Sequence, residues 1–376
     1  MRSINRLSYQ AFIAAALCLI SQSFSEPYIA VRSGFKCSVC HVNGTGGGKR
    51  TDFGEVYTQY KLLMQSPMTE NHPYSFDQKL NKSISVGANF RIEQSYAPKL
   101  SSKAANLGDT IKTAESIWNP GGFKERNLYI DVDLVKDWLK LYYDKDMGGG
   151  FARELWAKVN LPANTYFKFG HMLLPYGYRL MDDEAFVRST TGYTYSVSTL
   201  AYEVGIEPGP LSLVTNLTAT SITSVGSLVF NHMPFIRTAR LGGSISRRLK
   251  TKEKDHYGSY GVFAGTAFGM FTFLGERDYT KDYDVSKKVE TNKVEDYMEM
   301  DFLPIRGWNI KTVYESLWPD KKIDQGSNNQ TRLTVGLEPF VTQFLQLGLY
   351  YRMNAWIPQN PEKNQDQIVG RLHVFF

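Results

Sequence analysis

The stretch Asn127-Leu-Tyr-Ile-Asp-Val-Asp-Leu134 decides the fold of this chain, because apolar and polar side chains alternate along it residue by residue. A period of two indicates a β-strand with one apolar and one polar face. The same alternation returns at 139–143, 155–161, 298–302 and 345–352. The sequence therefore predicts a mainly β protein.

Such stretches recur along most of the chain. Fifteen candidate strands lie near residues 83–96, 125–136, 138–146, 152–161, 164–172, 199–208, 210–219, 236–249, 257–267, 269–280, 295–303, 308–317, 331–341, 343–354 and 366–376. Bacterial single-chain barrels have even strand numbers, so we expect one more strand, near 221–231. We predict sixteen strands, with fourteen as the alternative. Polar stretches predicted to be loops lie near 97–122, 173–198, 281–294, 318–330 and 355–365.

The length of the strands and the end of the chain favour a membrane barrel over a β-sandwich. A tilted strand of about 10 residues spans the apolar band of an outer membrane. The chain ends in Ile368, Gly370, Leu372, Val374 and Phe376, which alternate up to a terminal aromatic, as in the C-terminal signal of bacterial outer-membrane proteins. Aromatic residues make up 14% of the chain, which suits the two interfacial girdles of such a barrel. We predict a transmembrane antiparallel β-barrel over residues 81–376, surrounded by outer-membrane lipid.

The N-terminus predicts export. Arg2 and Arg6 precede an apolar segment, Ala11 to Ile20, which is too short to span a bilayer. Ser23 and Ser25 suit a cleavage site just before Glu26, so residues 1–25 are predicted to be a signal peptide. The formal net charge of +6 is spread along the chain, and we expect no nucleic-acid partner.

The mature chain keeps two cysteines, and they form a haem motif. Cys37-Ser-Val-Cys40 is followed at once by His41, which is the C-x-x-C-H pattern of covalent haem attachment. Two thiols at this spacing reach the two vinyl groups on one edge of the porphyrin, and the next residue places an imidazole at the iron. A plain disulfide and a zinc site are the alternatives, and a zinc site would lack two ligands. We predict one haem c in a small domain over residues 26–80.

The rest of this domain contains a glycine-rich loop, 43–48, and a short helix that Thr51 or Asp52 begins and that runs to about Met64. We expect an apolar helix face that packs on the porphyrin, made up of Phe53, Val56, Tyr57, Tyr60 and Leu63 or Met64. Lys49 and Arg50 either pair with haem propionates or are solvated.

The sixth iron ligand stays open in the sequence. Met64, Met68 and His72 are the candidates within reach of the motif along the chain. The choice matters, because methionine ligation raises the reduction potential of a haem and histidine lowers it.

Two resemblances cover the mature chain. The stretch Tyr166 to Arg188 resembles the strand-and-turn region of phosphate-selective-type porins, and Arg32 to His41 is similar to the N-terminus of outer-membrane cytochrome-porin fusions of iron-oxidising bacteria. The glycine-rich run after His41 departs from those fusions, which have more Pro and Leu there. Cys37 and Cys40 carry over as haem attachment sites, and His41 as the proximal ligand; no distal ligand carries over.

The second resemblance implies an electron conduit. A single haem c would take electrons from an extracellular donor, Fe(II) in those fusions, and pass them to a periplasmic cytochrome or other carrier. If the protein is catalytic, it would be an Fe(II)-oxidising oxidoreductase. The alternative is a porin-like solute channel with a haem-binding periplasmic or plug segment, and lumen-facing Lys140, Lys158 and Lys168 would suit anions. The chain has no G-x-S-x-G, H-E-x-x-H or P-loop motif.

Overall fold

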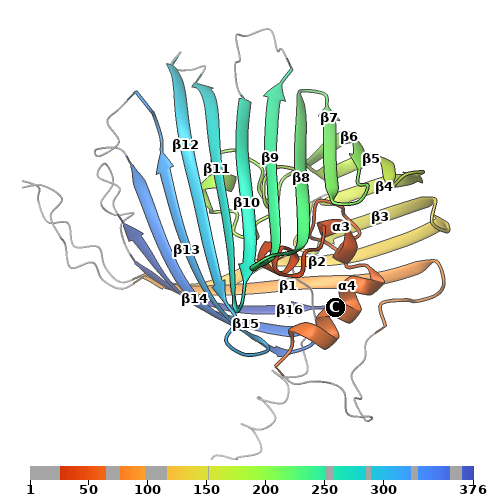
Figure 1. Ribbon diagram of the computed structural model, residues 1–376, viewed down its shortest axis with the longest axis horizontal. Helices are drawn as coiled ribbons and strands as arrows, with labels where there is room; N and C mark the ends of the chain where they lie inside the picture. The colour runs from red at the N-terminus through yellow and green to blue at the C-terminus, as the bar shows by residue number, and fades with distance from the viewer. Residues whose placement is uncertain are drawn as a thin grey trace, which may run out of the picture.

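The computed structural model describes residues 26–64, 77–97, 117–150, 152–249, 258–284, 289–322, 329–355 and 366–376. In this part of the chain, antiparallel strands follow one another around a closed barrel (Figure 1). The strands are β1 (Ile84–Ala97), β2 (Ile117–Val135), β3 (Leu139–Asp146), β4 (Glu154–Leu161), β5 (Thr165–Leu173), β6 (Ser198–Ile206), β7 (Leu211–Thr218), β8 (Ser221–Met233), β9 (Ile236–Arg248), β10 (Gly258–Phe268), β11 (Phe271–Asp284), β12 (Val289–Phe302), β13 (Trp308–Trp318), β14 (Gln330–Thr342), β15 (Leu345–Ala355) and β16 (Gln367–Phe375). The predicted number of sixteen is confirmed, and β8 is the strand expected near 221–231.

The alternation in sequence becomes an alternation between lipid and lumen. Along β6, Leu200, Tyr202 and Val204 are exposed, whereas Ala201 and Glu203 are buried. A sandwich would bury the apolar side chains, and this barrel buries the polar ones instead. The outer face is therefore the face that contacts lipid, and the interior is polar.

The last strand closes the barrel. β16 pairs with β15 on one side and with β1 on the other, where Phe375 lies opposite Asn89 and Leu372 lies opposite Ile92. Closure gives every strand two neighbours, so no strand has an open edge of unpaired backbone groups in the membrane. The alternating C-terminal residues are thus part of the wall that completes the barrel.

The two ends of the barrel differ in the length of their connections. Short turns join β2 to β3, β4 to β5 and β10 to β11, and Ile84 and Phe376 lie at the same end as these turns. In bacterial outer-membrane barrels the short turns face the periplasm and the long loops face outward. We call the two ends periplasmic and outer accordingly.

Two predicted boundaries are wrong. β2 begins at Ile117 rather than near 125, and the predicted loop 281–294 is mostly strand, because β11 runs to Asp284 and β12 begins at Val289. Cross-strand ion pairs accompany the polar part of this hairpin: Lys281–Glu290 and Lys293–Asp282 are both 3.0 Å apart. Ladder hydrogen bonds need no apolar side chains, so the strands continue past the apolar band that the sequence pattern detects.

Residues 26–64, hereafter the plug, lie inside the barrel at its periplasmic end (Figure 1). The plug contains α2 (Pro27–Ser33), α3 (Cys37–Cys40), α4 (Asp52–Tyr57) and a π-helical turn, η1 (Thr58–Leu62). Helix α2 has Pro27 at its first position, ends at Gly34 in the left-handed region with φ 68°, and packs on β9, β10 and β11. The predicted short helix is confirmed; Thr51 caps it by accepting a hydrogen bond from the Gly54 amide at 3.1 Å.

The long connection between β5 and β6, residues 174–197, also enters the lumen, and we call it the inner loop. Its one-turn helix α5 (Phe186–Ser189) lies against β11, β12 and β13. Arg188 on this helix is buried and pairs with Glu276 of β11. Among the residues that the structure describes, no helix is both long and apolar enough to span a bilayer.

Candidate functional site

Helix α3 positions the three residues of the haem motif. Cys37 and Cys40 lie three residues apart on this single turn, which places both on the same face. His41 is the residue at which the helix ends, and its amide donates to the Cys37 carbonyl at 2.9 Å. Both cysteines are half-buried free thiols, and His41 is buried. The structure thus brings the three predicted residues together.

The glycine-rich loop after His41 fixes the plug to the barrel wall and to the inner loop. The amide of Gly48 donates to the Tyr195 hydroxyl and the amide of Lys49 donates to the Tyr142 hydroxyl, both at 3.0 Å. Gly47 and Gly48 have φ of 77° and 66°, and a Cβ at either would overlap one of those tyrosines. Glycine is therefore required at Gly47 for close approach to the inner loop and at Gly48 for close approach to the wall.

The motif faces a pocket within the lumen, hereafter the motif pocket. Cys37, Cys40 and His41 line it from the plug, and the inner loop contributes Pro175 to Arg179. The barrel wall contributes side chains of β7 to β10, which include Val214, Val225, Arg240 and Phe263. The pocket encloses about 1050 Å³, counting the part open to solvent.

Burial keeps the side chains of His41 and Cys40 neutral. Burial and the Arg50 guanidinium lower the pKa of His41 to about 3, so its imidazole carries no charge at neutral pH. Burial raises the pKa of the Cys40 thiol to about 11, although Arg50 opposes this. A neutral imidazole is the form that binds a metal, and a thiol with a raised pKa is a poor zinc ligand.

Of the three candidate sixth ligands, the structure describes Met64. Met64 lies at the periplasmic rim, where its amide donates to the Phe340 carbonyl at 3.1 Å and its atoms pack on Gly307. In the described part of the chain it does not line the motif pocket. Met68 and His72 lie outside the described residues, as does the predicted signal peptide. The distal ligand stays a prediction.

The helix after the loop turns only part of its predicted face inward: Tyr57 lines the motif pocket and Leu63 is buried. Phe53, Val56 and Tyr60 are exposed, and the helix lines the motif pocket with Gly54, Tyr57, Thr58 and Leu62. A Cβ on Gly54 would overlap the Cys40 carbonyl, so this glycine sets which face turns toward α3. The apolar pattern could not reveal this orientation, because Gly54 has no side chain and its close contact with Cys40 leaves no trace in the hydropathy of the sequence.

A second cavity, hereafter the passage, lies between the inner loop and the wall of β12 to β16, β1 and β2. It measures about 1860 Å³, again with the part open to solvent. Its lining runs from Asn119 and Gln367 in the outer half down to Glu26 and Pro27 of the plug. The passage therefore reaches the plug from the outer side.

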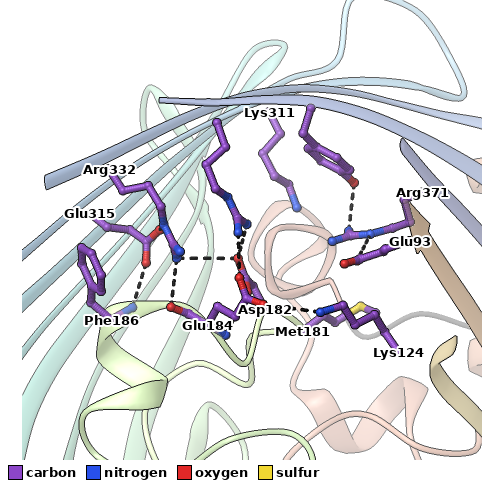
Figure 2. Close-up of polar contacts among 12 residues, drawn as sticks. Glu93, Lys124, Met181, Asp182, Glu184, Phe186, Lys311, Glu315, Arg332 and Arg371 are labelled. Carbon is purple, nitrogen blue, oxygen red and sulfur yellow. Dashed lines mark hydrogen bonds and ion pairs between the residues drawn. The ribbon is translucent and has the colours of Figure 1, made fainter. Parts of the chain in front are cut away.

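Opposite charges face each other across the passage (Figure 2). Asp182 of the inner loop accepts from Arg352 at 2.6 Å, and Arg332 lies 3.7 Å from the same carboxylate. Burial alone would raise the pKa of Asp182, yet Arg352 and Arg332 hold it well below its usual range. Glu184 pairs with Arg352 at 3.1 Å. The acidic inner loop is thus held against a basic wall.

Sequence reasoning missed most of these charged residues. Period-two alternation places Arg332 and Arg352 in strands, but it cannot say that they face the inner loop. Conversely, two of the three lysines predicted to suit anions already pair with carboxylates of the chain. Lys168 lies 2.7 Å from Glu203, and Lys140 lies 2.6 Å from Asp131. Lys158 lies over the Tyr166 ring, 5.4 Å from its centroid.

No protein-family model and no curated protein matches the chain. Solved structures do match. A loop L8 deletion mutant of OmpT, an outer membrane protein of Vibrio cholerae, superposes with a TM-score of 0.56 at 10% identity, over 78% of this chain and 99% of that one. An anion-selective porin from Comamonas acidovorans gives 0.53 at 11% identity, over 78% and 98%. Pseudomonas putida OprB gives 0.53 at 11%, over 78% and 94%.

At such identities the likeness shows the fold. It agrees with the closed barrel, its apolar outer face and its polar interior. The chain is a porin-like β-barrel of the Gram-negative outer membrane, in contact with lipid around its circumference.

Proposed function

We propose that this protein is a porin-like outer-membrane channel whose lumen carries a haem c, attached to the plug through Cys37 and Cys40 and ligated by His41. The observation that carries the proposal is the position of the motif. All three residues line a pocket that the barrel wall and the inner loop complete. This position favours a haem-binding plug over a periplasmic tether.

The residues around the motif pocket fit a haem group. Helix α3 offers two thiols on one face, and the buried, neutral imidazole of His41 follows them directly. Tyr57, Val214 and Phe263 supply apolar and aromatic walls. When bound, haem supplies one-electron redox chemistry.

The protein's own residues would hold this group in place and shield it. Cys37 and Cys40 anchor it to α3, and His41 is kept neutral and buried for the iron. The Asn43 side chain donates to Glu154 of β4 at 3.0 Å, which ties the loop after His41 to the wall. The barrel thereby excludes lipid from the pocket and limits its contact with water.

The passage supports the channel part of the proposal. Its opposed charges solvate ions and polar molecules, and its lining extends from the outer half of the barrel to Glu26 of the plug. The likeness to solved porins supports the same interpretation. Small polar solutes and ions would enter from the outer end and meet the plug.

Electron transfer across the outer membrane is the second candidate function. One observation favours it: Glu26 and Pro27 line both the passage and the motif pocket, so the two cavities adjoin at these residues. An extracellular donor in the passage would lose one electron, and a periplasmic cytochrome or other carrier would gain it. Fe(II) is the donor that the sequence resemblance implies.

A haem-stained denaturing gel of separated outer and inner membranes tests the proposal. The full chain is expressed with the cytochrome c maturation system, beside Cys40→Ala. We expect a haem-positive band in the outer membrane that the variant weakens or loses. An outer-membrane band without haem would leave a porin and end the haem proposal.

Conductance of the purified full chain in planar bilayers separates the two activities. Steady ion current with haem bound supports a channel. A haem-positive protein that passes no current, yet whose chromophore is reduced by Fe(II) added on the outer side of proteoliposomes, supports the electron conduit instead.

A further inference from the structure

We infer that Arg50, Arg179 and Arg240 form an anion-binding lining of the motif pocket, and that they pair with the carboxylates of the bound haem. One residue comes from the plug, one from the inner loop and one from β9, and all three line the pocket. The inference rests on the proposed haem site and adds that the barrel itself binds the cofactor.

The three guanidinium groups have few polar partners. Arg240 is 5% exposed; its Nη1 lies 3.8 Å from the Cys37 sulfur, and its Nε is buried with no hydrogen-bond partner in the described part of the chain. Arg50 is also 5% exposed, with its guanidinium 4.8 Å from the centroid of the Phe375 ring. Arg179 is half-buried and, among the described residues, donates only to neutral oxygens, at 2.9 Å to the Thr45 hydroxyl and 3.2 Å to the Leu174 carbonyl.

None of the three forms an ion pair with a described residue, whereas most other buried cations of the lumen do. Those pairs include Arg153 with Asp144 at 2.6 Å, Lys168 with Glu203 at 2.7 Å, Arg188 with Glu276, Arg332 with Glu315 at 2.5 Å, and Arg371 with Glu93 at 2.7 Å. Buried Lys49 also lacks a carboxylate partner in the described part of the chain, but it donates to the Arg50 carbonyl at 3.0 Å and to the Gln78 side chain at 2.9 Å. Burying a charge without a partner is costly. Two buried guanidinium groups and a half-buried third around one pocket indicate that an anion belongs there.

Haem carries two propionate carboxylates, which are ionised at neutral pH and are its charged groups besides the iron. Guanidinium groups bind carboxylates through two parallel hydrogen bonds, and they do so best where water is excluded. The cofactor would thus be covalently bound to the plug and ionically bound to the inner loop and the wall. Haem attachment should therefore tighten the seating of the plug.

A double-mutant cycle tests this coupling. Hydrogen–deuterium exchange in residues 26–64 is measured on the full chain with haem and on Cys37→Ala/Cys40→Ala without it, each with and without Arg240→Leu. With haem, we expect Arg240→Leu to speed exchange about tenfold, the equivalent of about 1.4 kcal/mol. Without haem, exchange should stay unchanged or slow down, because an uncompensated buried charge is gone. Arg247→Leu, exposed on the same strand, is the matched control.

Equal acceleration with and without haem would overturn the inference, since Arg240 would then act only through its bond to the Phe35 carbonyl. A wild-type protein without haem would instead remove the proposed function, and the inference with it. If Arg240→Leu fails to assemble, the midpoint potential of the haem is measured against pH in Arg179→Gln instead. A guanidinium keeps the pKa of a nearby carboxylate low, so its loss should make the midpoint potential depend more steeply on pH between about pH 5 and 8. An unchanged pH profile contradicts the inference.

Discussion

Lys311 Nζ on the wall strand β13 lies 2.7 Å from a carboxylate oxygen of Glu26, the first described residue of the plug. Glu338 and Glu299 also approach this ammonium group, at 3.4 and 3.8 Å. One buried cation thus serves three buried carboxylates from the plug and two wall strands. The ion pair ties the plug to the side of the barrel that faces the passage.

Replacing this cation should loosen the plug. Lys311→Met leaves three carboxylates without their shared partner, and breaking a buried pair on one side typically costs about 3–5 kcal/mol. We expect amide exchange in residues 26–64 to accelerate at least tenfold. Lys136→Met, in an exposed turn between β2 and β3, is the control. Unaltered exchange in Lys311→Met would mean that the plug is held without this pair.

The contact between the plug and the barrel should become less stable as pH rises. Burial raises the pKa of Glu26 from 4.5 to about 7; Lys311 opposes the rise, and Glu338 and Glu299 add to it. A raised pKa in the folded state means that the protonated carboxyl is favoured there. Its stabilising contribution is complete below about pH 4.5 and is lost as pH rises through about 7.

Glu26→Gln should remove this dependence. At one pKa unit per about 1.4 kcal/mol, the change amounts to about 3 kcal/mol at most. Exchange in the plug is compared between wild type and Glu26→Gln at each pH, so that intrinsic exchange rates cancel. The ratio of the wild-type exchange rate to the Glu26→Gln exchange rate should grow between about pH 5 and 7. A constant ratio would show that Glu26 does not titrate in this window.

Glycine at position 48 should be essential for docking of the plug. Gly48→Ala strains a backbone with φ of 66° and places a methyl group against the Tyr142 hydroxyl. The backbone strain alone costs about 1–2 kcal/mol, and the overlap adds to it. Gly192→Ala separates the two effects, because Gly192 has φ of 80° and open space around it. Faster exchange at residues 41–50 is expected for Gly48→Ala only.

Ion selectivity should respond to Asp182. Asp182→Asn removes the carboxylate that faces Arg352 and Arg332 across the passage, so the net charge there becomes more positive. We expect the reversal potential under a salt gradient to move toward anion selectivity. Asp137→Asn, in an exposed periplasmic turn, should leave it unaltered. If a conducting protein shows the same reversal potential in both variants, ions do not pass beside Asp182.

Much of the wall could be predicted because its signal is local. Alternation along 127–134 or 345–352 reports which residues face lipid, whatever the rest of the chain does. The motif at Cys37 to His41 is equally local, since its chemistry depends on spacing within one helical turn. The predicted strand ends were wrong where backbone pairing continues without an alternating side-chain pattern, as in the polar hairpin of β11 and β12.

The sequence by itself determined the barrel and its membrane-facing surface, and it predicts a haem motif at Cys37, Cys40 and His41. Only the tertiary structure decided that the motif lies within the lumen and which residues surround it. Arg240, beside the Cys37 sulfur, is 203 residues away along the chain. Such residues come together only when the barrel closes, because their positions depend on the register of every strand pair between them. No short stretch of sequence specifies all of these registers.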